Sequence, residues 1–230
     1  NKTSTGESNG FNVKEINLPD ITTTEELLSE IYKSKDFDGI QLMWPLPDHI
    51  DSGRAYNAIE IDRDVDGAHF IGQIEIDASS SPLPPVTPAA AMELVDNYNI
   101  DLKGKNVLVV GRSRIVGSPM AHMLRARNAV VTVAHSQTSK EDLMIMVGFA
   151  DIVVSCAGEP GVLDASWLKQ DAVVVNIGTT FSEDHDSLFS DFGFEDNLTS
   201  NEAVKQYSPV PGGVGPLSVA QLYKNVARAA

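Results

Sequence analysis

Cysteine is almost absent: Cys156 is the only one among 230 residues. A single thiol excludes a disulfide framework within the chain and a cysteine-based metal cluster. Cys156 follows an apolar run, so buried packing is a better prediction for it than nucleophilic catalysis. The five histidines share no regular spacing, and we expect no metal site.

Basic residues and long apolar runs are also scarce. The chain has 17 Lys and Arg against 32 Asp and Glu, a net charge of −15, which argues against a nucleic-acid or anionic-membrane surface. No apolar run is long enough to span a membrane, and no signal-peptide pattern is present. We therefore expect a protein of the cytoplasm or mitochondrial matrix that is not secreted. Because the chain begins at Asn1 rather than Met, we interpret it as a processed or partial chain.

The most informative segment is VLVVGRSRIVGSP at 107–119, which has the pattern of a strand, a glycine turn and the start of a helix. The apolar run ends at Gly111, and Arg112 and Arg114 lie inside the turn. Free N–H groups and a partial positive charge at a helix N-terminus suit a phosphate. The segment has neither the GxGxxG nor the GK[ST] pattern. A plain strand-to-helix turn therefore remains an alternative.

The next apolar run favours NADP as the ligand of this loop. Residues 130–134 predict a strand that ends in the sequence HSQT. In dinucleotide-binding folds an acidic residue near this point binds the ribose 2′-hydroxyl, whereas a basic residue accommodates a 2′-phosphate. No acid is present here, and Ser136 with Arg112 fits NADP better than NAD.

Strands and helices alternate from Lys105 onward. Apolar runs at 107–110, 130–134, 152–156 and 172–177 are separated by helical patterns. This alternation predicts an α/β fold with a Rossmann-like parallel sheet that is covered on both faces.

The flanking segments are less regular. The box Thr23 to Glu26 predicts a helix start, and 40–43 predicts a buried strand. The Ser- and Pro-rich stretch 79–88 is a plausible domain junction. Residues 181–202 are acidic and are expected to be irregular, and a glycine-proline loop at 208–216 precedes a final helix.

Several motifs together resemble one family. They are DVDG at 64–67, PVTP at 85–88, GRSRIVGSP at 111–119, HSQT at 135–138, ADIVVSCAG at 150–158 and PVPGGVGPLSVA at 209–220. In order and spacing they resemble the methylenetetrahydrofolate dehydrogenase/methenyltetrahydrofolate cyclohydrolase family. The resemblance implies NADP-dependent oxidation of 5,10-methylenetetrahydrofolate and hydrolysis of the methenyl product to 10-formyltetrahydrofolate. It also implies a homodimer.

The resemblance implies two domains with a cleft between them. Residues 1–88 correspond to a smaller α/β folate-binding and catalytic domain that lacks its first strand–helix segment. Residues 89–207 correspond to the NADP-binding Rossmann domain. Residues 208–230 correspond to a loop and a C-terminal helix that returns to the first domain.

The resemblance also implies roles for individual residues. Lys2 matches the catalytic lysine, which polarises the bridging group and assists the attack of water. Asp66 matches the aspartate that binds the pterin ring, so it is both a catalytic and a substrate-binding candidate. The other substrate-binding candidates are Pro211, Gly212 and Gly213. The NADP-binding candidates are Gly111, Arg112, Ser113, Ile115, Ser136, Gly158, Gly178 and Thr179.

The chain departs from the family pattern mainly on the folate side. Met43 stands where the family has a glutamine that supports the lysine, and Gln41 lies two residues earlier, about 6–7 Å away along a strand. The family's tyrosine before the lysine would precede Asn1. Gly72 and Ile74 replace part of an Asn-x-Gly motif. Asn176 replaces an aspartate.

These departures predict that hydride transfer is better preserved than hydrolysis. Hydride transfer depends mainly on placing two bound molecules face to face, whereas cyclohydrolysis needs the acid–base group itself. Two alternatives remain open: a degenerate family member that serves as a structural subunit of a larger assembly, and a different NADP oxidoreductase with the same architecture.

Overall fold

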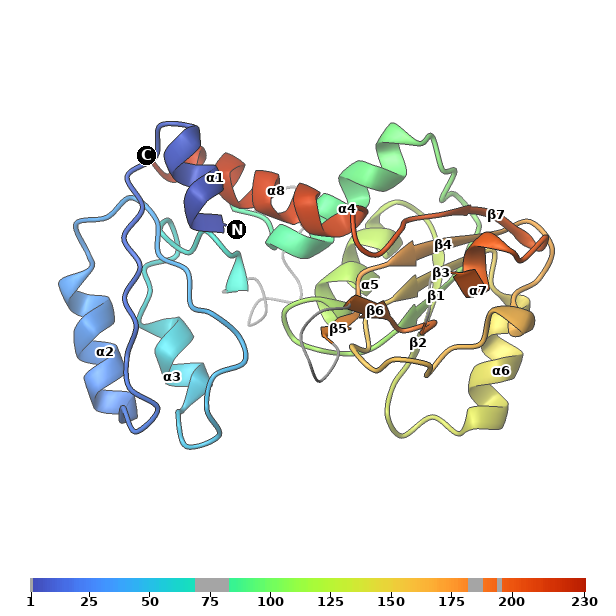
Figure 1. Cartoon of the computed structure of the whole chain (residues 1–230), viewed down its shortest axis with the longest axis horizontal. Helices are drawn as coiled ribbons and strands as arrows, with labels where there is room; N and C mark the ends of the chain where they lie inside the picture. The colour runs from blue at the N-terminus through green and yellow to red at the C-terminus, as the bar shows by residue number, and fades with distance from the viewer. Residues whose placement is uncertain (1, 69–82, 182–187, 194–195) are drawn as a thin grey trace. The chain divides into compact units, whose positions relative to one another are not determined.

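The computed structural model describes residues 2–68, 83–181, 188–193 and 196–230. The chain forms two compact units (Figure 1): unit 1 comprises Asn1–Val86 and Val219–Ala230, and unit 2 comprises Thr87–Ser218. In the described part of the chain, no helix is long and apolar enough to cross a membrane.

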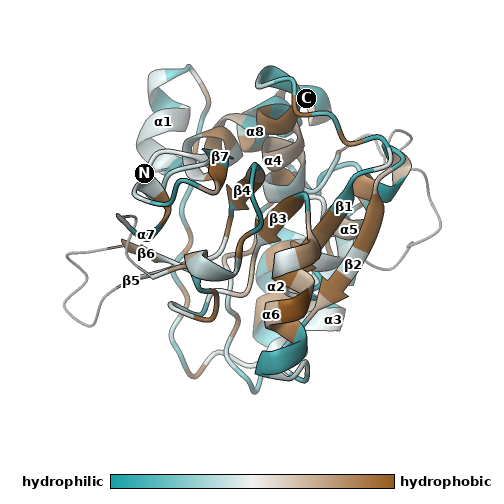
Figure 2. Cartoon of the chain, turned by 90° about the vertical axis from the view of Figure 1, so that its right-hand side faces the viewer, coloured by the Kyte–Doolittle hydropathy of each residue, from teal (hydrophilic) through white to brown (hydrophobic). Residues whose placement is uncertain are grey.

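Unit 2 is built on a five-stranded parallel sheet with the strand order β2-β1-β3-β4-β7. The strands are β1 (Asn106–Val110), β2 (Val130–Ala134), β3 (Ile152–Ser155), β4 (Ala172–Asn176) and β7 (Val204–Tyr207). The apolar composition of β1, β2, β3 and β4 is visible as brown ribbon in Figure 2. The predicted third and fourth strands each end one residue early, so Cys156 and Ile177 already belong to the following loops.

Helices and short turns cover both faces of this sheet. Val107 and Val109 belong to one core cluster with residues of α4 and α5, whereas Leu108 and Val110 belong to another with residues of α6. The alternation follows from the strand period of two. The elements that supply these clusters are α4 (Val86–Asn97), α5 (Gly117–Ala126), α6 (Lys140–Phe149), the 3₁₀ turn η2 (Ala165–Trp167) and α7 (Asp196–Thr199). The predicted α/β fold with a two-sided parallel sheet is confirmed.

The acidic segment after β4 is more ordered than the sequence predicts. β5 (Thr179–Phe181) and β6 (Leu188–Ser190) form a two-stranded antiparallel sheet. Asp191, directly after β6, is fully buried. The prediction of an irregular segment was wrong for these residues, because a local antiparallel pairing and a buried carboxylate organise them.

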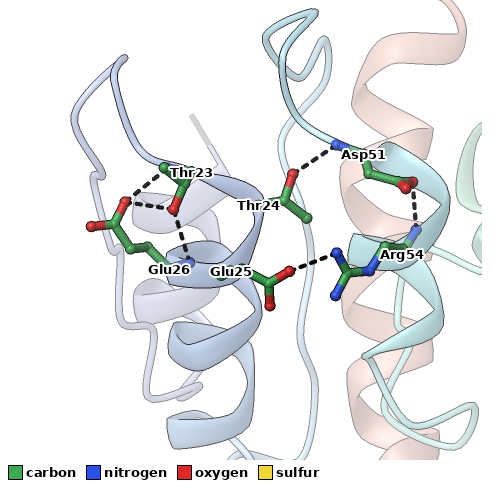
Figure 3. A network of polar contacts seen from close by, with 6 residues as sticks. All are labelled: Thr23, Thr24, Glu25, Glu26, Asp51 and Arg54. Atoms are coloured by element: carbon green, nitrogen blue, oxygen red, sulfur yellow. Dashed lines mark hydrogen bonds and ion pairs between the residues drawn. The ribbon is translucent and has the colours of Figure 1, made fainter.

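Unit 1 holds α1 (Lys2–Ser8), α2 (Thr24–Lys33), α3 (Ser52–Asn57) and most of the C-terminal helix α8 (Val214–Ala229). Figure 3 shows how α2 and α3 begin. Thr23 and Glu26 form the predicted capping box, and Asp51 caps α3 through the backbone N–H of Arg54. The Arg54 side chain reaches Glu25 at 2.6 Å and joins the two helix starts.

The predicted buried strand at 40–43 was wrong. Ile40 forms a single parallel bridge with Asp64, through its N–H and the carbonyl oxygen of Arg63 at 2.8 Å. Among the described residues this segment pairs no further, and Met43 is 63% exposed. A strand needs a partner along its length to satisfy its backbone groups, and the described residues supply one at Ile40 only.

Candidate functional site

Lys2 is the first residue of α1, and it is held at both ends. Its ammonium Nζ donates to Oε1 of Gln41 at 3.3 Å and lies 3.7 Å from Sδ of Met43. Its carbonyl oxygen accepts from the hydroxyl of Tyr223 on α8 at 2.8 Å. A Cβ on Gly6 would lie 2.1 Å from that hydroxyl oxygen, so only glycine lets α1 approach Tyr223 this closely.

Asp66 is linked to the lysine through the same glutamine. Nε2 of Gln41 donates to Oδ1 of Asp66 at 2.8 Å. Burial raises the pKa of the Asp66 carboxyl, and Asp64 adds to the increase, while the hydrogen bond from Gln41 and the charge of Lys2 oppose it. Unit 1 therefore contains a continuous side-chain connection from Lys2 to Asp66.

The turn that carries Asp66 is fixed by α8. Asn225 is fully buried, and its Nδ2 donates to the carbonyl oxygens of Val65 and Pro84, each at 2.9 Å. Its Oδ1 accepts from Gln221 at 2.9 Å. One buried amide thus ties both flanks of the turn to the helix.

An unpaired hydroxyl lies close to this turn. Tyr56 is buried, and its hydroxyl has no hydrogen-bond partner among the described residues. Burial raises the pKa of Tyr56, and the charges of Asp66 and Asp64 raise it further. The ring of Trp44 stacks on Tyr56 with the centroids 5.1 Å apart. An unsatisfied buried hydroxyl is costly unless a ligand pairs with it, so this position suits a polar group of a bound molecule.

In unit 2 the predicted cofactor residues gather at one edge of the sheet. Gly111 follows β1, Ser136 follows β2, Gly158 follows β3, and Gly178 follows β4. The carboxyl ends of parallel strands share one edge, which is where open α/β sheets bind ligands. The sheet topology therefore brings these four positions together.

In the turn after β1, the backbone of Gly111 lies very close to the backbone of Cys156. Gly111 has φ +123°, and a Cβ there would lie 2.6 Å from the carbonyl oxygen of Cys156. Oγ of Ser113 accepts from the N–H groups of Val116 and Gly117, each at 3.3 Å. The sequence suggested that the backbone N–H groups at the start of α5 are free. Two of them, those of Val116 and Gly117, already donate to Ser113. The Ser113 hydroxyl proton remains available to donate to a phosphate oxygen.

The cationic side chains of this loop are accessible. Arg112 and Arg114 are exposed, and the ion pairs among the described residues do not involve them. Ser136 is also exposed, whereas Ile115 is half-buried. The exposed side chains can meet an anion, and Ile115 offers apolar contact beside it.

Asp191 anchors the loops after β3 and β4. Its carboxylate accepts from the backbone N–H groups of Ala157 at 2.8 Å and Glu159 at 3.0 Å. A Cβ on Gly178 would lie 2.2 Å from Oδ2 of Asp191, so Gly178 has a packing role. Burial raises the pKa of Asp191, while these N–H donors oppose the shift. Thr179 begins β5 and is exposed.

Pro211, Gly212 and Gly213 lie in the loop between β7 and α8. Gly212 has φ +106°, a conformation that favours glycine. Nδ2 of the buried Asn176 donates to the carbonyl oxygen of Ser208 at 2.9 Å, just before this loop. An aspartate carboxylate could not donate there, so Asn176 has a structural use of its own.

Sequence reasoning missed Tyr223, Asn225 and Asp191. Asn225 was detectable in principle, because Gln221 and Asn225 are polar residues one helical turn apart within the apolar pattern of the last helix. No local signal marks Asp191, whose partners lie more than 30 residues away. Gly72 and Ile74, and the first part of the predicted domain junction, lie outside the described residues.

A parallel sheet with glycine turns and accessible arginines at its carboxyl edge defines a dinucleotide-binding α/β domain. Residues 85–230 match the tetrahydrofolate dehydrogenase/cyclohydrolase NAD(P)-binding domain, and residues 1–66 match the catalytic domain of the same family. The chain belongs to the tetrahydrofolate dehydrogenase/cyclohydrolase family.

Individual relatives agree along most of the chain. The bifunctional protein FolD 2 of Pseudomonas savastanoi pv. phaseolicola is 39% identical over 235 residues, covering 100% of this chain and 77% of the relative. The crystal structure of the Trypanosoma brucei methylenetetrahydrofolate dehydrogenase-cyclohydrolase, complexed with NADP and an inhibitor, superposes with a TM-score of 0.91 at 34% identity, covering 99% of this chain and 79% of that one. The crystal structure of the corresponding Campylobacter jejuni enzyme superposes with a TM-score of 0.88 at 34% identity, covering 99% of this chain and 80% of that one. These matches favour the enzymatic interpretation over the structural-subunit alternative.

Proposed function

We propose that the protein oxidises 5,10-methylenetetrahydrofolate with NADP and hydrolyses the methenyl product to 10-formyltetrahydrofolate. The observation that carries this proposal is the side-chain connection from Lys2 through Gln41 to Asp66. The connection links two groups with different uses. Lys2 can transfer a proton, and the carboxylate of Asp66 can bind a pterin. The named activities of the relatives support the same two steps.

On the cofactor side, NADP supplies the hydride acceptor when bound. We assign Gly111, Arg112, Ser113 and Ile115 to the loop that holds its phosphates and ribose. We assign Ser136 and Arg112 to the 2′-phosphate, because no acid directly follows β2 to favour a free 2′-hydroxyl. We assign the remaining contacts with NADP to Gly158, Gly178 and Thr179.

On the folate side, Asp66 accepts hydrogen bonds from the aminopyrimidinone edge of the pterin, as an ionised carboxylate with two acceptor oxygens can. Lys2 polarises the bridging group and assists the attack of water on the methenyl carbon. We also assign Pro211, Gly212 and Gly213 to folate binding. In domain terms, residues 1–88 bind folate, residues 89–207 bind NADP, and residues 208–230 return the chain to the first domain.

The decisive test follows each step separately on the purified full-length protein. Dehydrogenase activity is read from NADPH absorbance with 5,10-methylenetetrahydrofolate, and cyclohydrolase activity from the loss of methenyltetrahydrofolate absorbance. We expect both rates to exceed the uncatalysed rates and NADP to be preferred over NAD. Absence of NADPH formation would overturn the proposal.

We also propose that the protein is a homodimer of the cytoplasm or mitochondrial matrix, where NADP and reduced folates are available. Support for the dimer comes from β2, which is an edge strand of the sheet. Its Val130 and Val133 are 56% and 39% exposed, and Ile145 and Phe149 of α6 are 66% and 69% exposed. Exposed apolar side chains on an unpaired sheet edge are typical of an association surface.

A further inference from the structure

Gln41 lies between the two side chains that we assign to catalysis. Its Oε1 faces Nζ of Lys2 at 3.3 Å, and its Nε2 faces Oδ1 of Asp66 at 2.8 Å. An ammonium only donates and a carboxylate only accepts, so the amide can satisfy both neighbours in this orientation alone. We propose that Gln41, and not residue 43, positions Lys2 for the hydrolytic step and couples it to Asp66. This inference rests on the proposed function.

Residue 43 is poorly suited to the task. Sδ of Met43 lies 3.7 Å from Nζ of Lys2, and the side chain is 63% exposed. A thioether is a weak acceptor, and an exposed contact competes with water. The amide oxygen of Gln41 is therefore the stronger partner for the ammonium.

The bridge also keeps the two charges apart. The ion pairs among the described residues do not include one between Lys2 and Asp66. Tyr223 fixes only the backbone of Lys2, so the position of its ammonium depends on Gln41. Among the described residues, the other titratable groups whose charges act on Asp66 or are affected by it are Asp64 and Tyr56, and the hydrogen bond that lowers the pKa of Asp66 comes from Gln41.

The first experiment compares Gln41→Leu with Met43→Leu, and it uses Gln170→Leu, at an exposed position of unit 2, as control. We expect Gln41→Leu to lower the cyclohydrolase kcat at least about ten-fold and the dehydrogenase kcat less than about three-fold, because only hydrolysis uses the positioned proton-transfer group. Met43→Leu should lower the cyclohydrolase kcat less than Gln41→Leu does, and Gln170→Leu should change neither kcat. Adding Met43→Gln to Gln41→Leu should recover part of the hydrolysis, since it returns an amide to the lysine.

Two results would overturn the inference while leaving the proposed function intact: an equal loss of both activities in Gln41→Leu, or a larger loss of hydrolysis in Met43→Leu. A wild-type protein without either activity would instead overturn the proposed function.

A second measurement does not depend on turnover. Carbon-13 NMR titration of the Asp66 carboxyl should show a higher pKa in Gln41→Leu than in the wild type, because a hydrogen bond to the ionised form is lost. Circular dichroism melting confirms that the variant is folded. An unchanged pKa of Asp66 would contradict the coupling.

Discussion

At the scale of single residues, we propose Lys2 as the group on which hydrolysis depends most. Replacing it by methionine keeps an unbranched apolar stem and removes the proton-transfer group. We expect Lys2→Met to lower the cyclohydrolase kcat about 100-fold or more, which is the usual contribution of general acid–base catalysis. The dehydrogenase kcat should stay within about three-fold, because hydride transfer depends on positioning by other residues.

Lys33→Met is the matched control, because Lys33 is an exposed lysine of α2 that pairs with Glu30. Both activities should be unchanged in it. A parallel loss of dehydrogenase and cyclohydrolase activity in Lys2→Met would mean that the lysine supports the fold of the site rather than the hydrolytic step.

Asp66 sets a pH dependence whose direction follows from its surroundings. Burial raises its pKa above the ordinary value, and the proposed binding of the pterin uses the ionised form. The dehydrogenase kcat/KM should therefore fall as the pH decreases through the raised pKa, with the inflection above the usual aspartate value of about 4. A pH profile measures this inflection. Asp66→Asn should remove it, and an inflection that persists in that variant would assign it to another group.

The connection from Lys2 through Gln41 to Asp66 could be predicted only in part from the sequence. The resemblance predicts roles for Lys2 and Asp66, but Gln41 was set about 6–7 Å from the position of the family's glutamine by assuming a regular strand. The structure has only a bridge at Ile40, so that spacing does not apply. Nothing in the local sequence shows that Gln41 contacts partners 39 and 25 residues away.

At the scale of elements, α8 holds the turn that carries Asp66. Asn225→Leu would leave the buried carbonyl oxygen of Val65, the partly buried carbonyl oxygen of Pro84 and the amide of Gln221 without their partner. We expect the free energy of unfolding to fall by about 3 kcal/mol, since each unsatisfied buried group costs about 1–3 kcal/mol. The KM for folate should rise, because Val65 precedes Asp66.

Chemical denaturation and steady-state kinetics measure the two effects of Asn225→Leu. Asn57→Leu, at an exposed position of α3, is the control and should change neither. If Asn225→Leu lowers stability without changing the KM for folate, then α8 supports the fold of unit 1 but does not position Asp66.

Elements were predicted well where the sequence has a continuous apolar pattern and poorly where that pattern is absent or has no pairing partner. β1, β3 and β4 are continuous apolar runs that end near glycine, which is the pattern of strands buried on both faces. The expected strand at 40–43 has similar apolar residues, but it lacks a partner beyond Ile40 among the described residues. The β5–β6 pair was missed because the sequence of 181–202 is acidic, a pattern that is typical of loops.

At the scale of the whole molecule, a net charge of −15 works against association of two copies. An apolar contact at β2 has to overcome this repulsion, and salt screens charge repulsion over about 10 Å or less at 0.1 M ionic strength and above. The proposed dimer should therefore become tighter as the salt concentration rises, which sedimentation velocity can follow. Weaker association at higher salt would indicate an interface held by ion pairs.

A substitution at the same edge tests where the dimer forms. Val133→Lys places a charge on β2, where it meets an apolar surface in the proposed dimer and solvent in the monomer. We expect the molar mass from light scattering to shift from dimer toward monomer, with little change in the melting temperature at low protein concentration, because Val133 is already 39% exposed. Ile61→Lys is the matched control, since Ile61 is 52% exposed in unit 1. Dissociation by Ile61→Lys but not by Val133→Lys would place the interface away from the β2 edge.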